Sequence, residues 1–356
     1  MQTITNIERG DHIATIREIA QLAEVSTATV SRVLNNDTTL STSIETRDRI
    51  FAIAEELDYK PQRLKKLKQE MKRSTLQIGL LFWSMAEDEK DDPYFAAVRR
   101  GIEVHCEQLG ISITKVIRGD FTTALAEAEG LDGLLVVGSI EVQDVLDIYT
   151  QPDRIVFVNH GEELFDYDSV HLNFDGAIRT SYQYLTSLGH EKIGFIGGVE
   201  WVHSLRDRPS IRRSEEHRYV AYTRMMRESG HYYACVEWVD DWSSQGGYEA
   251  MQRILMRGDR PTACLIASDN MAVGALHALH EAGISVPQHM SIVGFNDIEL
   301  AAFVNPPLST VHAHTELLGE TAVKMLVERL EGRKVAMQVK LNTTFVERNS
   351  CMNNKD

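Results

Sequence analysis

One short segment carries side-chain types suited to contacting DNA bases. Residues 25–36, VSTATVSRVLNN, are small and mostly uncharged apart from Arg32. Thr27 can hydrogen-bond to a base or touch a thymine methyl group, Ala28 offers only a methyl group, and Arg32 can fork onto guanine O6 and N7. Hydroxyls better placed for phosphate contacts belong to Ser26, Thr29 and Ser31. Apolar residues at helical spacing can bury the other face: Val25, Val30, Val33 and Leu34.

The surrounding residues predict the elements that would hold this segment. Thr15 and Glu18 fit a capping box, Ser26 can cap the next helix, and Thr42 with Glu45 fits a second capping box. We expect three helices, beginning near residue 16 and covering about 27–35 and 44–57. Two helices joined by a tight turn, with a third packed on them, form a helix-turn-helix unit whose second helix enters the major groove. An ordinary three-helix surface bundle fits the same spacing.

The charge is distributed unevenly along the chain. The net charge is −15, yet residues 60–73, KPQRLKKLKQEMKR, hold seven Lys/Arg and one Glu. A basic band on an acidic protein lets one end approach phosphate while the rest is repelled. A solvated, flexible linker is the alternative interpretation of this band.

From residue 76 onward, short apolar runs alternate with longer amphipathic stretches. Continuous apolar runs alternating with helices predict parallel strands covered on both faces, an α/β fold. Ligands bind such sheets beyond the carboxyl ends of the strands. The runs cover 76–82, 111–117, 131–138, 154–159, 192–198, 263–269 and 290–297.

Several function classes lack their sequence signatures. The four cysteines show no C-x-x-C spacing, which disfavours a zinc ribbon and a disulfide framework. The chain has no G-x-x-x-x-G-K-[ST] loop and no G-x-S-x-G elbow. The first thirteen residues hold no apolar signal region, and no apolar run approaches the roughly 18 residues of a membrane span. We therefore expect a cytoplasmic protein with no cofactor, no metal and no membrane partner.

The text IREIAQLAEVSTATVSRVLNN closely resembles the headpiece of the LacI/GalR family of bacterial repressors, with its pattern A-x-V-S-x-x-T-V-S-R-V-L-N. The likeness continues through TRDRIFAIAEELDYKP and along the whole body. It implies a helix-turn-helix headpiece at 14–60, a hinge at 61–74 and an effector-binding and dimerisation domain at 75–348. The headpiece residues that it implies for DNA binding are Ser26, Thr27, Ala28, Thr29, Ser31, Arg32 and Asn35.

In this family the hinge forms a short helix on the operator, and a leucine wedges into the minor groove. The resemblance makes Leu67 the candidate, because an inserted apolar side chain kinks the duplex. Leu67 comes one residue earlier in the chain than the wedge leucine of most family members, so Leu64 is the alternative candidate. Lys65, Lys66 and Lys68 would neutralise phosphates and make affinity fall steeply with salt.

The body resembles a periplasmic sugar-binding protein, with two Rossmann-like lobes joined by three crossings. The resemblance places the first lobe at about 75–173 and 312–334, and the second at about 174–311 and 335–348. Trp242 matches the position that stacks on a sugar ring, and Arg218 matches an arginine that can bridge two hydroxyls. The full set implied for effector binding is Tyr94, Phe95, Asn159, Arg218, Trp242, Ser268, Asp269 and Asn296.

The resemblance implies a homodimeric repressor that binds double-stranded operator DNA and is released by a small sugar. The D-P-Y-x-x-x-R-x-G-I-E text at 92–103 is similar to family repressors of β-galactosidase operons, which favours a galactoside. Amides at Asn159 and Asn296, where relatives often carry acids, suit a neutral ligand. Alternatives remain: a sugar or sugar phosphate as co-repressor, a pure sugar-binding protein, or a sugar hydrolase, which no placed acid–base pair supports.

Overall fold

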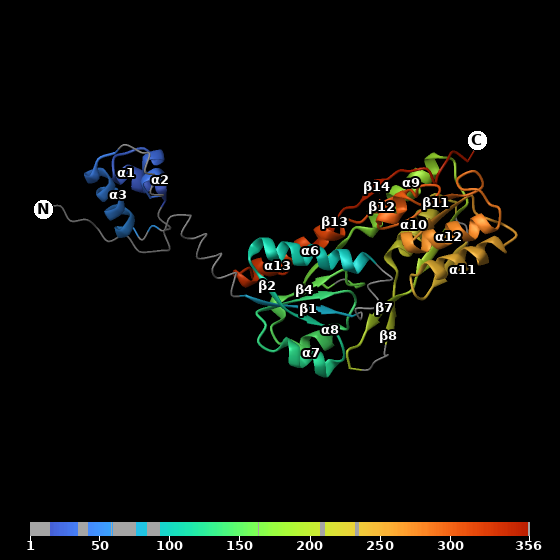
Figure 1. Cartoon of the computed structure of the whole chain (residues 1–356), viewed down its shortest axis with the longest axis horizontal. Coiled ribbons are helices and arrows are strands. Elements are labelled where there is room, and N and C mark those ends of the chain that lie inside the picture. The colour runs from blue at the N-terminus through green and yellow to red at the C-terminus, as the bar shows by residue number, and fades with distance from the viewer. Residues whose placement is uncertain are drawn as a thin grey trace. The chain divides into compact units, whose positions relative to one another are not determined.

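The chain forms two compact units, Met1–Thr75 and Leu76–Asp356, described separately below (Figure 1). The computed structural model describes residues 15–34, 42–57, 59, 76–83, 93–162, 164–206, 211–231 and 235–354. Within these residues, no helix combines the length and apolar character needed to cross a membrane.

The first unit contains the three predicted helices. They are α1 (Ile16–Leu22), α2 (Thr27–Leu34) and α3 (Ile44–Glu56). The capping box is confirmed, because the Glu18 amide donates to Thr15 Oγ1 at 3.3 Å and the Thr15 amide donates to Glu18 Oε2 at 2.8 Å. Ser26 caps α2 as predicted, accepting from the Thr29 amide at 3.0 Å.

The cap predicted for α3 at Thr42 is wrong by one residue. The amide of Thr46 donates to Ser43 Oγ at 3.2 Å, so Ser43 caps the helix. Thr42 and Ser43 both carry a hydroxyl group that can accept from the amide three residues later, so the local sequence does not distinguish the two possible caps. Once capped, the helices pack on a small shared core in which Ile19, Val30 and Ile50 are fully buried.

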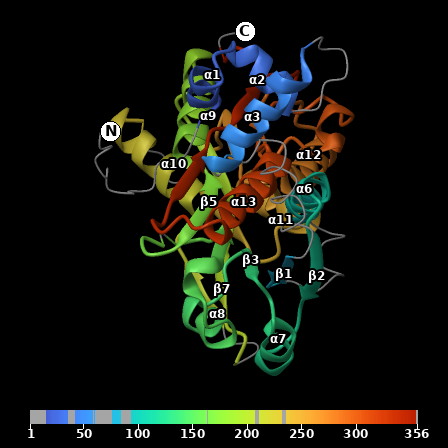
Figure 2. The same cartoon turned by 90° about the vertical axis from the view of Figure 1, so that its left-hand side faces the viewer.

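The first lobe of the second unit is a parallel six-stranded sheet in the order β13-β5-β4-β3-β1-β2. Helices α6 and α13 lie on one face, and α7 and α8 lie on the other (Figures 1 and 2). The strands are β1 (Gln77–Phe82), β2 (Ser112–Ile117), β3 (Gly133–Val137), β4 (Ile155–Val158), β5 (Asp168–Leu172) and β13 (Gln338–Leu341). The helices are α6 (Pro93–Leu109), α7 (Phe121–Ala128), α8 (Val142–Ile148) and α13 (Thr315–Leu330), with a 3-10 turn at Pro152–Arg154.

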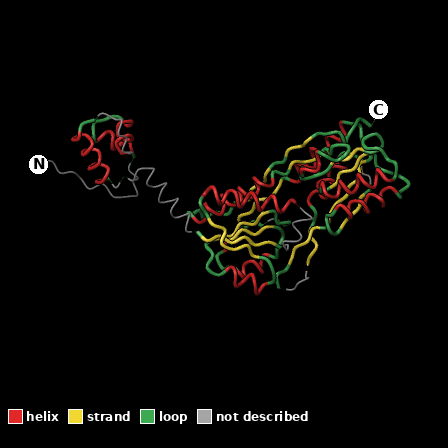
Figure 3. The backbone as a smooth tube through the Cα atoms, viewed as in Figure 1, coloured by secondary structure: helices red, strands yellow, loops and turns green. Residues whose placement is uncertain are grey.

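The second lobe is a parallel four-stranded sheet in the order β11-β10-β6-β9. Helix α9 packs beside α10, and α11 packs beside α12, so strands are again layered between helices (Figure 3). The strands are β6 (Ile193–Gly198), β9 (Val236–Val239), β10 (Ala263–Ile266) and β11 (Ser291–Val293). The helices are α9 (Phe174–Ser187), α10 (His217–Glu228), α11 (Ser244–Leu255) and α12 (Asp269–Glu281), with a 3-10 turn at Glu299–Ala302. The predicted α/β body of two Rossmann-like lobes is confirmed.

Three crossings join the lobes, after β5, after β12 (Thr310–His312) and between β13 and β14 (Thr344–Val346). Side chains tie the crossings together, with Asn173 Nδ2 donating to Asn342 Oδ1 at 2.9 Å and His314 Nε2 lying 2.9 Å from Thr344 Oγ1. β14 pairs antiparallel with β12.

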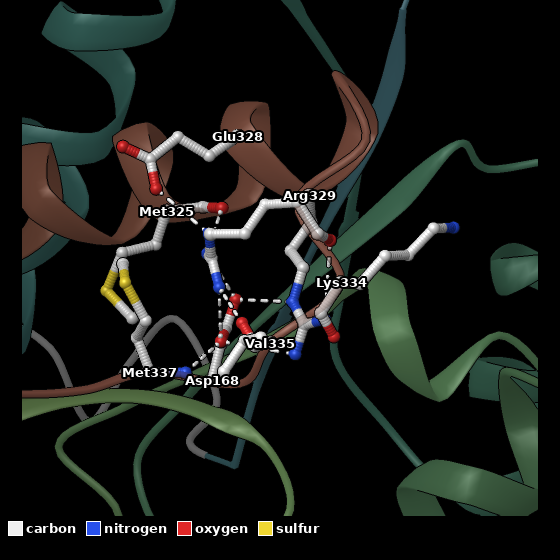
Figure 4. A network of polar contacts seen from close by, with 8 residues as sticks. Asp168, Met325, Glu328, Arg329, Lys334, Val335 and Met337 are labelled. Carbon is white, nitrogen blue, oxygen red and sulfur yellow. Dashed lines mark hydrogen bonds and ion pairs between the residues drawn. The ribbon is translucent and has the colours of Figure 1, made fainter.

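The predicted lobe boundary at residue 335 is wrong. β13 pairs parallel with β5, so residues 338–341 extend the first-lobe sheet, and the chain enters the second lobe only after them. The buried carboxylate of Asp168 holds this end of the sheet in place (Figure 4). It accepts from Arg329 Nε at 2.9 Å, from Arg333 Nη2 at 2.6 Å and from the amide of Met337 at 2.6 Å. One carboxylate thereby links β5, the end of α13 and the segment leading into β13.

Candidate DNA-binding and effector sites

Helix α2 presents the predicted face to solvent. Thr27, Ala28 and Arg32 are exposed, whereas Val30 and Val33 on the opposite face are buried in the headpiece core. Ser26 is exposed, and Thr29 and Ser31 are partly buried. A narrow helix bearing short side chains and one arginine on its exposed face has the shape needed to enter a DNA groove.

The remaining residues predicted for DNA binding lie outside the described residues. They are Asn35, Lys65, Lys66, Leu67 and Lys68, together with the rival wedge Leu64.

In the second lobe, Trp242 lies directly beside the end of β6. Its Nε1 donates to the carbonyl oxygen of Val199 at 3.1 Å, and the indole is half-buried. A Cβ added to Gly198 would lie 2.1 Å from Trp242 Cε2, so only glycine leaves room for the ring. Trp242 itself has a φ of 56°, a left-handed conformation that is rare for a bulky residue and that we associate with a constrained site.

Arg218, at the start of α10, is buried beside this tryptophan. Its Cζ lies 4.6 Å from the centre of the Trp242 ring and 5.0 and 5.2 Å from those of Phe174 and Phe295. Sequence spacing alone could not predict this cluster, because its members come from four separate segments. An arginine packed among aromatic faces gains cation–π attraction and leaves a mixed apolar and polar surface.

Each of the three nitrogens of the Arg218 guanidinium donates a hydrogen bond to a protein acceptor. Nε donates to Glu216, Nη1 donates to the carbonyl oxygen of Ala267 at 2.8 Å, and Nη2 donates to Glu200 Oε1 at 3.1 Å. Burial lowers the pKa of Arg218, but the carboxylates of Glu216 and Glu200 outweigh burial and raise it overall. Arg218 is therefore a fixed cation, in which each of the three nitrogens donates at least one hydrogen bond to a protein acceptor.

Asn296 supplies an acceptor next to this cluster. It follows Phe295, has a φ of 107°, and its Oδ1 is buried without a hydrogen-bond partner among the described residues. A buried carbonyl oxygen without a donor costs free energy, so this atom suits a hydroxyl supplied by a ligand.

The first lobe contributes residues from α6 and from the end of β4. Tyr94 is buried and Phe95 is partly buried, with their rings edge to face at 5.1 Å. Asn159 is half-buried after β4 with a φ of 54°. The first lobe thus holds three residues of the predicted effector set, Tyr94, Phe95 and Asn159.

Ser268 and Asp269 are both buried, and Asp269 is fully so. The Asp269 carboxylate accepts from Thr310 Oγ1 at 2.7 Å and from the Ile298 amide at 2.9 Å. Burial raises its pKa to about 7, although these hydrogen bonds act in the opposite direction. Asp269 therefore ties α12 to β12 and the loop after β11, and this geometry does not support the predicted contact with an effector.

A hairpin that sequence reasoning missed reaches from the second lobe to the first. β7 (Glu200–His203) and β8 (Ile211–Ser214) pair antiparallel, and we call them, with residues 204–206, the interlobe hairpin. His203 exchanges backbone hydrogen bonds of 2.9 Å with Ser139 and Glu141. Leu205 is fully buried in a first-lobe core cluster.

Trp83, at the end of β1, is a second aromatic residue that the prediction omitted. Its ring stacks on His203 of the interlobe hairpin, with centroids 4.3 Å apart and planes at 14°, and meets Phe95 edge to face at 5.9 Å. The L-L-F-W-S text at a strand end is the signal that could have marked it, because strand ends carry ligand sites in α/β folds.

No group of three or more His, Cys, Asp or Glu suited to a metal ion occurs within the described part of the chain. The described geometry instead combines aromatic rings, an engaged arginine, an accessible carboxylate at Glu200 and a buried amide oxygen. Such a surface suits a small ring with an apolar face and several hydroxyls.

A helix-turn-helix headpiece joined to a two-lobed binding body defines a ligand-controlled DNA-binding protein, and comparison with known proteins agrees. Residues 15–62 match the family described as bacterial regulatory proteins, lacI family, and residues 182–351 match the periplasmic binding protein-like domain. The chain is 40% identical to the HTH-type transcriptional repressor MelR of Bacillus subtilis (strain 168), over 94% of this chain and 97% of the relative. It is 34% identical to the HTH-type transcriptional regulator GalR of Lacticaseibacillus casei, over 96% and 100% of the two chains. The chain belongs to the LacI family and is a DNA-binding transcriptional regulator.

Solved structures show the same architecture. The lac repressor dimer bound to operator and the anti-inducer ONPF matches with a TM-score of 0.66 and 25% identity, over 96% of this chain and all of that one. The lac repressor bound to ONPG in the repressed state matches with a TM-score of 0.65 and 26% identity, over 95% and 100%.

Proposed function

We propose that this regulator is a repressor that an uncharged sugar, a galactoside, releases from its operator. The sugar binds beside Trp242, Arg218 and Asn296. The observation that carries the proposal is the buried Oδ1 of Asn296, which has no hydrogen-bond donor within the described part of the chain. It lies next to a cluster of aromatic rings and one arginine. Sugar rings present an apolar face to aromatic side chains and donate hydroxyl hydrogens to such oxygens.

Two copies of the chain act together in the cytoplasm. In a homodimer, two α2 helices reach successive turns of a pseudo-palindromic operator, with Thr27, Ala28 and Arg32 at base edges. A solved neighbour is a lac repressor dimer bound to operator, which supports this arrangement. The protein acts by binding and does not transform the sugar.

Release follows from linkage between the two sites. The sugar must bind more tightly to the conformation that has low DNA affinity, because a ligand with equal affinity for both states shifts neither. The operator must then weaken sugar binding by the same factor. A co-repressor would instead bind more tightly to the conformation that has high DNA affinity.

Two variants separate the sites. We expect Trp242→Ala to bind operator like the wild type but to lose release by sugar. We expect Arg32→Ala to bind sugar normally while losing operator affinity by roughly 5- to 150-fold, the value of about 1–3 kcal/mol for one bidentate base contact. Binding to a fluorescent operator fragment and calorimetric titration with lactose measure the two properties. Loss of operator binding in Trp242→Ala would make that residue structural and remove the proposed sugar site.

A further inference from the structure

The segment that follows β4 in the first lobe makes a direct contact with the second lobe. The carbonyl oxygen of Gly161 accepts from His217 Nε2 at 2.9 Å and from Ser214 Oγ at 3.4 Å. Ser214 ends β8 and His217 begins α10, so both donors come from second-lobe elements. A carbonyl oxygen can only accept, and His217 therefore carries a hydrogen on Nε2. This hydrogen bond exists only while the two lobes lie close together on this side, as they do in this structure.

The first-lobe side of this contact is held in place by its neighbours. The Gly161 amide donates to Ser139 Oγ at 2.7 Å. The buried ring of His160 donates from Nε2 to the carbonyl oxygen of Ile140 at 3.0 Å and accepts at Nδ1 from the Glu162 amide at 3.1 Å. An imidazole that donates at one nitrogen and accepts at the other is neutral, and burial favours this form by lowering the pKa of His160. The Gly161 carbonyl oxygen is thus presented to the second lobe in a fixed position.

The second-lobe side of the contact adjoins the effector cluster. His217 directly precedes Arg218, and its ring lies parallel to that of Phe174, with centroids 6.1 Å apart and planes at 5°. The same Phe174 ring lies 5.0 Å from Arg218 Cζ. In the first lobe, Asn159 lies two residues before Gly161. The hydrogen bond therefore joins the segments that carry Asn159 and Arg218, one predicted effector residue from each lobe.

We propose that His217 is a positioning residue that stabilises, through its hydrogen bond to the Gly161 carbonyl oxygen, the arrangement of the lobes to which the sugar binds. This inference rests on the proposed function and adds a residue that links the sugar site to operator release. A sugar that contacts residues of both lobes binds best when the lobes are close, and a contact made only in that arrangement raises its population. Loss of the contact therefore weakens sugar binding and favours the conformation that has high operator affinity.

Two substitutions separate the hydrogen bond of His217 from the packing of its ring. His217→Phe keeps an aromatic ring beside Phe174 but has no donor, whereas the matched control His217→Gln keeps an N–H donor without the ring. Calorimetric titration of the full-length protein with galactose, lactose and melibiose measures sugar affinity. We expect His217→Phe to bind sugar about 2- to 12-fold more weakly than the wild type, the effect of one neutral hydrogen bond, and His217→Gln to lose less than about twofold.

Operator binding distinguishes this role from a general loss of structure. Fluorescence anisotropy of a labelled operator fragment is measured without sugar and at the sugar concentration that releases half of the wild-type protein. His217→Phe should keep more DNA bound than the wild type at that concentration, and its operator affinity without sugar should not fall.

Three results overturn the inference while leaving a sugar-responsive repressor in place. They are weaker operator binding by His217→Phe without sugar, unchanged sugar affinity in that variant, and an equal loss of sugar affinity in His217→Phe and His217→Gln. Failure of every sugar to bind the wild-type protein overturns the proposed function, and the inference with it.

Discussion

Asp144 of α8 fastens the interlobe hairpin to the first lobe, and its removal gives a quantitative prediction. Its side chain is 7% exposed. The carboxylate accepts from Ser204 Oγ at 2.9 Å, from the Leu205 amide at 2.8 Å and from Arg206 Nε at 3.0 Å. Asp144→Ala removes all three hydrogen bonds without touching the hairpin itself.

The free energy lost in Asp144→Ala depends on which of the three donors can hydrogen-bond to water instead. The Leu205 amide belongs to a fully buried residue, and an unsatisfied buried donor costs about 1–3 kcal/mol. Ser204 is partly exposed and Arg206 is exposed, so each loses about 0–1 kcal/mol. Attachment of the hairpin should weaken by about 1–5 kcal/mol, which corresponds to roughly 5- to 5,000-fold more frequent local opening.

Native-state hydrogen exchange measures this opening directly. Exchange of the Leu205 and His203 amides should accelerate by the factor above, while amides in the headpiece keep their wild-type rates. Asp147→Ala is the matched control, because Asp147 forms an ion pair with Arg206 of the hairpin and its side chain is 36% exposed. That variant should accelerate exchange less than about fivefold. Equal exchange in the two variants would refute the assignment of Asp144 as the anchor.

The remaining predictions concern packing, pH and capping. Asp168→Asn should lower the free energy of unfolding in urea by about 3–5 kcal/mol, because two buried or nearly buried arginines lose their counter-charge; a loss below about 1 kcal/mol would contradict the network. Asp269 has a pKa raised from 3.8 to about 7, so its contribution to stability is full below pH 3.8 and is lost as the pH rises toward 7. The wild type should therefore lose stability over that range relative to Asp269→Asn, and parallel curves would refute this. In Gly198→Ala the new methyl group displaces the indole of Trp242, so sugar affinity should fall roughly tenfold or more with operator affinity intact; unchanged sugar titrations would contradict it. Ser26→Ala removes the α2 cap and should cost about 1 kcal/mol, seen as faster exchange of the capped amide, and unchanged exchange would count against the cap.

The sequence predicted regular elements well because their signals are local. The capping box at Thr15 and the burial of Val30 and Val33 depend on neighbours within four residues, and the structure confirms them. The assignment of 335–348 to one lobe failed because it depends on pairing between β13 and β5, which lie far apart in the chain. The sequence of an apolar strand does not by itself indicate which sheet the strand will join.

The candidate site was predictable only in part. Family resemblance placed Arg218 and Trp242 in one site, and the structure brings them to 4.6 Å. It did not reveal the ion pair between Arg218 and Glu200, because that contact depends on a hairpin whose strands are four residues each. For Asp269, the strand-end position suggested ligand contact, whereas burial turns the carboxylate inward.

The most direct test of the central claim is fluorescence anisotropy of a labelled DNA fragment from upstream of this protein's own gene. Protein is titrated at fixed salt with competitor DNA, because phosphate contacts make affinity depend strongly on salt. Galactosides and other sugars are then added one at a time. We expect tight, competitor-resistant binding that a neutral galactoside reverses. Specific binding only in the presence of a sugar would contradict it and make that sugar a co-repressor.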